Sequence, residues 1–82
     1  MKLPRSLSGL EFAKLLAEYG YRTTRQTGSH LRLTSTIKDK EHHITIPKHN
    51  PLRVGTLSGI VTEIAAYLEK DKKDFLSELF GK

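Results

Sequence analysis

The residues of this chain that could take part in a reaction are its four histidines and the basic residues near them. Histidine exchanges protons near neutral pH, and arginine and lysine stabilise negative charge on a phosphate. RNA carries its own nucleophile, the 2′-hydroxyl. A histidine with basic neighbours and backbone amides can therefore supply most of what RNA cleavage needs without a metal ion. The residue types thus favour metal-independent phosphodiester chemistry.

His30 is the histidine best placed for such a reaction. It follows Gly28, which lets a backbone approach a phosphate closely, and Ser29, which can donate a hydrogen bond. Alternation along the predicted strand turns His30 to the same side as Arg32 and, we expect, across from His43. A surface histidine that merely opens a strand is the alternative interpretation, because Gly-Ser-His is a common tripeptide.

Other basic residues could assist His30. His49 follows Lys48 in the loop after the third predicted strand. His49 could act as a second proton carrier, and either residue could bind a phosphate. The arginines that could hold phosphates are Arg22, Arg25, Arg32 and Arg53. For each of these residues, a solvated surface charge is the alternative interpretation.

Several other classes of site are disfavoured by the sequence. The absence of Cys excludes disulfides and thiolate metal sites. The adjacent His42 and His43 point to opposite faces of a regular strand, so they cannot bind one metal ion together. No glycine-rich phosphate loop or His-Glu-x-x-His motif is present. We expect no metal and no cofactor, and with no signal peptide or membrane span in the sequence we expect a cytoplasmic protein.

Length and charge agree with a small RNA-directed domain. The chain has 82 residues, enough for one domain spanning 1–82, and 37% of them are hydrophobic, so the core must be thin. Residues 1–58 hold 10 basic and 4 acidic residues and carry +6, whereas residues 59–82 hold 4 basic and 5 acidic residues and carry −1, so the total charge is +5. A basic region of this size suits a polyanion such as RNA, although ordinary solubilising charge explains it too.

Local patterns predict the elements that position these residues. Ser8 and Glu11 have capping-box spacing, Phe12, Leu15, Leu16 and Tyr19 form an apolar stripe, and Gly20 ends this first helix. Strands are predicted at 21–26, 30–34 and 42–46, with a hairpin turn at Thr27-Gly28. Thr56 is the predicted N-cap of a second helix and Asp71 that of a third, although no Gly or Pro separates the two.

The expected fold is α+β, in the order α-β-β-β-α(-α). Short links make the three-stranded sheet antiparallel, and both main helices should pack on one face of it. The inward residues are Leu31, Leu33, Ile44 and Ile46, whereas the open face carries His30, Arg32, His43 and Thr45. This is the architecture of the double-stranded-RNA-binding domain and its relatives.

Over nearly its whole length the chain resembles the HicA (YcfA-like) family of toxins. The matching segments are Leu7-Ser8-Gly9, Tyr19-Gly20-Tyr21, Arg25 to His30, Ile44 to His49, Val54-Gly55-Thr56-Leu57 with Ile60, and Lys73 to Leu76. The resemblance implies a toxin of a type II toxin–antitoxin pair with a double-stranded-RNA-binding-like fold. Such a toxin is a ribonuclease that cleaves mRNA and stops translation. The resemblance also implies that His30 is the catalytic histidine and that a HicB antitoxin covers the active face.

The chain departs from the family pattern at two places. The segment from Ser35 to Glu41 is longer and more polar than usual, and the customary glycine before the last helix is missing. Two other functions stay open. One is a non-catalytic RNA-binding module, although Gly55-Thr56-Leu57-Ser58 lacks the lysine cluster expected of ordinary double-stranded-RNA-binding domains. The other is an interaction protein whose positive face binds an acidic partner.

Overall fold

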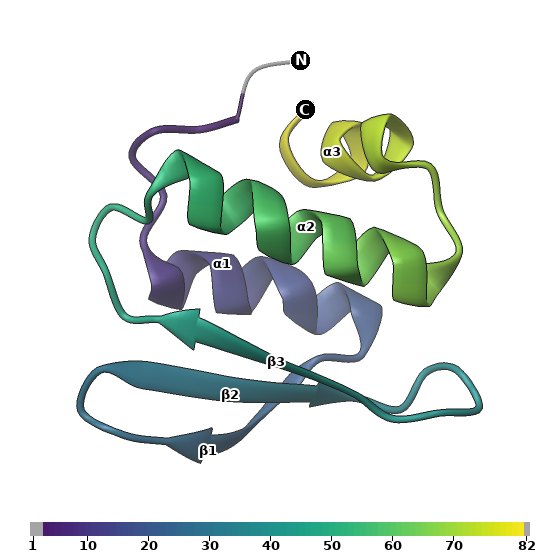
Figure 1. Ribbon diagram of the computed structural model, residues 1–82, viewed down its shortest axis with the longest axis horizontal. Coiled ribbons are helices and arrows are strands. Elements are labelled where there is room, and N and C mark those ends of the chain that lie inside the picture. The colour runs from purple at the N-terminus through teal and green to yellow at the C-terminus, as the bar shows by residue number, and fades with distance from the viewer. Residues whose placement is uncertain (1–2, 82) are drawn as a thin grey trace.

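A capped helix leads into a three-stranded sheet, and two further helices follow it (Figure 1). The computed structural model describes residues 3–81. The elements are α1 (Gly9–Leu16), a 3-10 turn η1 (Ala17–Tyr19), β1 (Arg22–Gln26), β2 (His30–Ser35), β3 (His42–Pro47), α2 (Val54–Leu68) and α3 (Lys72–Phe80). The order α-β-β-β-α-α and the α+β class are those predicted.

The capping box predicted for α1 is formed. The amide of Glu11 donates to Ser8 Oγ at 3.1 Å, and the amide of Ser8 donates to Glu11 Oε1 at 2.9 Å. The helix passes through η1 and ends at Gly20, whose φ of 82° is the left-handed conformation that glycine adopts freely. Phe12 and Leu16 are buried, but Leu15 is exposed. Its predicted place in the apolar stripe is wrong, because α1 covers the sheet with a narrower face.

The sheet is antiparallel with β2 in the centre, between β1 and β3. The inward residues predicted for β2 and β3 are all buried: Leu31, Leu33, Ile44 and Ile46. β1 differs, since all five of its residues are exposed and its pairing with β2 has an irregularity between Thr23 and Arg25. Figure 1 shows the helices gathered on one side of the sheet and the other side left uncovered.

α2 and α3 are separate helices. Glu69 ends α2 with a φ of 57°, so a glutamate occupies the left-handed position for which glycine is the usual residue. Asp71 caps α3 as predicted, because its carboxylate accepts from the amides of Lys73 and Asp74 at 2.8 and 3.2 Å. α3 also contacts η1, since Phe75 meets the Tyr19 ring edge-on at 5.0 Å.

The predicted start of α2 at a Thr56 cap is wrong. The helix begins at Val54 after Arg53, which makes no side-chain cap. The preceding residue, Leu52, is buried and its amide donates to the carbonyl of Leu7 at 2.7 Å. This anchor fixes where the chain turns into the helix, two residues before Thr56.

Within residues 3–81, no helix has the length and apolar character needed to cross a membrane.

Candidate active site

A shallow pocket of about 200 Å³ opens on the uncovered face of the sheet. Its lining comes from all three strands and from the β1–β2 turn: Arg25, Thr27, His30, Arg32 and Thr45. All five residues are exposed. Three residues proposed from the sequence, His30, Arg25 and Arg32, therefore meet in one place.

The strand register explains why these side chains share a face. Arg32 of β2 lies opposite Arg25 on one side and Thr45 on the other. Thr23 lies opposite the buried Leu33, so in a regular strand Arg25, two residues later, would point to the same inner face. The bulge between Thr23 and Arg25 changes this alternation. It is this irregularity that turns Arg25 toward the pocket.

The position of His30 is fixed by the turn before it. The hydroxyl of Ser29 lies 2.9 Å from His30 Nδ1, so a hydrogen bond holds one ring nitrogen and leaves Nε2 for a ligand. Thr27 Oγ1 accepts from the amides of Ser29 and His30 at 3.3 and 3.0 Å, and the Thr27 amide donates to the His30 carbonyl at 3.0 Å. Thr27 was missed by sequence reasoning. Its signal is a threonine two residues before the serine of a tight turn.

Lys48, the residue that directly follows β3, holds the same turn in place. Its Nζ donates to the carbonyl of Thr27 at 2.7 Å, and its amide donates to the carbonyl of Ser29 at 2.8 Å. Binding of phosphate by this lysine stays a prediction; in this structure its ammonium group holds the turn. Lys48 does not line the pocket.

Two like charges face each other beside His30. Arg25 and Arg32 are direct cross-strand partners, an arrangement that destabilises a sheet through repulsion. No acidic residue lines the pocket. The ion pairs within residues 3–81 join Lys38 to Glu69 and Lys70 to Glu78, so neither arginine is neutralised by one. A bound anion such as a phosphate would relieve this repulsion.

The remaining histidines lie away from the pocket lining. His49 is exposed, and its carbonyl accepts from the Gly9 amide at 2.9 Å. The expectation that His30 lies across from His43 is wrong, because His30 is paired with Pro47 and His43 with Thr34. The register shifts His43 four residues along the sheet from His30. There the Thr34 hydroxyl lies 2.8 Å from His43 Nδ1.

Comparison with models of known protein families shows to which family the chain belongs. A family model described as "HicA toxin of bacterial toxin-antitoxin" matches residues 9–69, which include α1, the sheet with Gly28-Ser29-His30, and α2. The chain belongs to the HicA toxin family. No curated protein and no solved structure matches it. As a family member, the protein is a toxin of a toxin–antitoxin system, and a cognate antitoxin is its implied partner.

His42 lies on the opposite face of the toxin's β3 from His43, as predicted. Its Nδ1 lies 2.6 Å from the Tyr21 hydroxyl, and its ring stacks on Tyr67 with the centroids 4.7 Å apart. Burial among these rings lowers the pKa of His42; the charge of Glu63 opposes this effect and His43 adds to it. Burial also raises the pKa of Tyr21. His42 therefore has a structural role on the helix-covered side of the sheet.

Tyr67 extends this cluster to the polar loop between β2 and β3. Its hydroxyl accepts from the amide of Lys38 at 3.1 Å and bonds to the carbonyls of Ser35 and Lys40. The long loop that departs from the family pattern is thus anchored to α2. Within the part of the chain that the structure describes, no three His, Asp or Glu side chains gather into a group that could hold a metal ion.

Proposed function

We propose that this HicA toxin is an endoribonuclease that cleaves mRNA, with His30 as its catalytic residue. The observation that carries the proposal is the uncompensated Arg25–Arg32 pair beside His30 in one open pocket. A protein gains nothing for its own stability from opposing arginines. The pair becomes favourable when a phosphodiester group binds between the two side chains.

The arrangement supplies the groups that RNA cleavage needs. His30 Nε2 is the atom that exchanges a proton with the substrate, because Nδ1 is held by Ser29. Arg25 and Arg32 stabilise the extra negative charge of the phosphorane as the 2′-oxygen bonds to phosphorus. The bond from phosphorus to the 5′-oxygen then breaks, and that oxygen takes up a proton to replace the one that the 2′-hydroxyl gave up. The products of this route are a 2′,3′-cyclic phosphate and a 5′-hydroxyl, and no metal ion is required.

The proposal includes control by a HicB-type antitoxin, as the family resemblance implies. The pocket lies on the face of the sheet that no helix covers, so it is accessible both to RNA and to a protein that would block it. In this scheme, binding of the antitoxin to the open face excludes mRNA and restores translation.

The test is cleavage of a defined mRNA by the purified toxin in buffer with EDTA. We expect wild-type toxin to cut the RNA and to leave 5′-hydroxyl ends, and His30→Ala to be slower by roughly 10²–10⁴-fold. His43→Ala is the matched control, because it removes another exposed histidine from the same face and leaves the pocket intact. Its cleavage rate should stay within a few fold of wild type, and both variants should keep the wild-type circular dichroism spectrum.

Two results would decide against this function. Equal cleavage by His30→Ala and wild type would show that another residue does the chemistry. Wild-type toxin that binds the RNA tightly and cuts none of it, with or without Mg²⁺, would indicate a non-catalytic RNA-binding module instead.

A further inference from the structure

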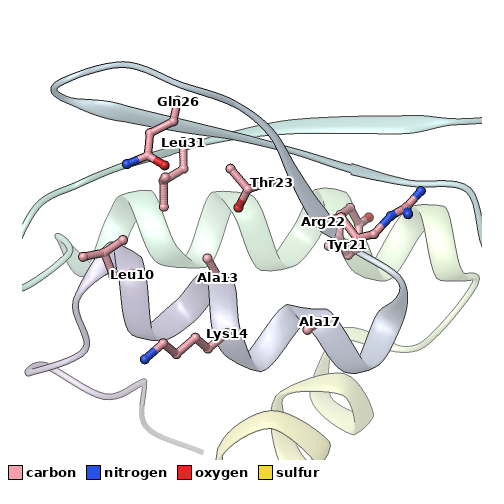
Figure 2. A pocket seen from close by; sticks show the side chains of 9 residues that line it. All are labelled: Leu10, Ala13, Lys14, Ala17, Tyr21, Arg22, Thr23, Gln26 and Leu31. Atoms are coloured by element: carbon pink, nitrogen blue, oxygen red, sulfur yellow. The ribbon is translucent and has the colours of Figure 1, made fainter.

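A second and larger hollow lies on the other side of β1, between that strand and α1 (Figure 2). Its volume is about 430 Å³. We call it the α1–β1 groove. Its apolar lining consists of Leu10, Ala13 and Ala17 from α1 and Leu31 from β2. The groove is separated from the candidate active site by the sheet itself, and the two sites share no lining residue.

The groove exists because the helices leave the edge of the sheet uncovered. Thr23 and Gln26 of β1 lie opposite the buried Leu33 and Leu31, so they belong to the inner face, yet both are exposed. On α1, Leu10 leaves 54% of its surface exposed beside the groove. Leu10 is not part of the buried core cluster of the free toxin. Such uncovered apolar surface next to a sheet edge is typical of an interaction site.

β1 also offers backbone groups for pairing. It is an edge strand, hydrogen-bonded to β2 on one side, with its other side free within the described chain. Its five residues span roughly 17 Å, at about 3.4 Å per residue. A guest strand added to this edge would turn alternate side chains to the inner face, which here is the groove. The groove and the free edge therefore fit one extended peptide.

The charges around the groove determine what kind of peptide fits. Lys14 and Arg22 line it, Arg25 follows on the same strand, and no acidic residue is in the lining. A second copy of β1 would set arginines against arginines, which disfavours self-pairing. RNA is disfavoured because the one aromatic residue of the lining, Tyr21, is 2% exposed and offers no face for base stacking. An extended segment with alternating apolar and acidic side chains fits all of these features.

We propose that the α1–β1 groove and the free edge of β1 bind an extended, acidic and apolar segment of the cognate antitoxin. The segment adds a fourth strand to the sheet, its apolar side chains enter the groove, and its carboxylates, on the opposite side of the added strand, pair with Arg22. This inference rests on membership of the toxin family and not on the proposed ribonuclease activity. The antitoxin thereby gains an attachment point that leaves the active-site pocket free for a separate contact.

The test uses the toxin and antitoxin co-expressed from their natural gene pair. Ala13→Glu places a negative charge in the groove, and Leu10→Glu does so at an exposed position, where folding is least affected. Leu15→Glu is the matched control, because Leu15 lies on the same helix, is exposed and does not line the groove. We expect both groove variants to weaken antitoxin binding by roughly 30-fold or more and the control to stay within about twofold. Amides 22–26 should exchange hydrogen more slowly in the complex than in the free toxin.

Growth assays separate this proposal from the proposed function. Groove variants should still arrest growth but should no longer be neutralised by the antitoxin. Unchanged neutralisation of both groove variants, or amides of β1 that exchange equally fast in the complex, would overturn the proposal. A twelve-nucleotide single-stranded RNA that loses affinity for the groove variants alone, or a toxin dimer that these variants dissociate, would also overturn it. A toxin that cuts no RNA would refute the ribonuclease and leave this result unaffected.

Discussion

Gly9 is the residue at which a single methyl group should do the most damage to this toxin. It is the first residue of α1 and is buried against the end of β3. A Cβ built on Gly9 would lie 2.1 Å from the carbonyl oxygen of Pro47 and 3.2 Å from Ile46 Cγ2. The first distance is 0.9 Å shorter than the 3.0 Å below which such contacts essentially do not occur. Gly9→Ala therefore requires α1 and β3 to move apart.

The cost of this movement follows from the contacts that it disturbs. Overpacking a core costs about 1–3 kcal/mol, and weakening the bond from the Gly9 amide to the His49 carbonyl, 2.9 Å long, adds roughly 1 kcal/mol. We expect a loss of about 3 kcal/mol from a folding free energy of roughly 4–12 kcal/mol for a chain of this size. Activity should fall too, because Pro47 is the cross-strand partner of His30.

Urea unfolding followed by circular dichroism measures this loss. With a slope of about 1 kcal/mol/M, the midpoint of Gly9→Ala should fall by about 3 M. Gly59→Ala is the matched control, because Gly59 is exposed inside α2 and a Cβ there meets nothing within 4 Å. That variant should gain about 1 kcal/mol, since alanine favours a helix. A Gly9→Ala midpoint equal to that of wild type would refute the close approach of α1 to β3.

Three further predictions concern the turn, the buried histidine and the last helix. Gly28→Ala should keep the wild-type melting temperature, because a Cβ at Gly28 meets nothing within 4 Å. RNA cleavage by this variant should fall about tenfold, since we expect the RNA to approach the backbone at Gly28. A large drop in melting temperature would contradict the open space around Gly28. The pKa of His42 is lowered in the folded toxin, so the unfolded chain binds more protons below about pH 6.5. The free energy of unfolding should therefore be highest above about pH 6.5 and should decrease as the pH falls toward 5. In His42→Asn this loss, measured as the change in urea midpoint between pH 7.5 and 5.5, should be smaller. Asp71→Ala should cost about 1 kcal/mol in thermal unfolding and leave RNA cleavage unchanged, because it removes the two cap bonds of α3 far from the pocket.

Much of the candidate site could be predicted because strand alternation is a local property. The period of two in β2 and β3 placed His30, Arg32 and Thr45 on the open face, and all three line the pocket. The prediction that His30 lies across from His43 was wrong, because that position depends on the strand register. Alternation says which face His43 occupies, but the pairing of β2 with β3 decides that Pro47, and not His43, stands beside His30.

Capping signals were similarly reliable where the bond is local. Ser8 with Glu11, and Asp71 with the amides after it, form their caps within three residues of sequence. The predicted cap at Thr56 failed because a distant contact, from Leu52 to Leu7, fixes the start of α2. The N-cap preference of a threonine contributes only about 1 kcal/mol, so contacts between distant residues can set the start of a helix at another position.

The sequence by itself determined the order of the elements, the buried face of the sheet and the histidine on its open face, since these follow from hydrophobic periodicity and local hydrogen bonds. Only the tertiary structure decided which groups join His30. The bulge in β1 turns Arg25 to the pocket, and Lys48, directly after β3, holds the β1–β2 turn in place. Both depend on how strands distant in sequence pair. The same pairing leaves β1 as an uncovered edge, and with it the groove that we assign to the antitoxin.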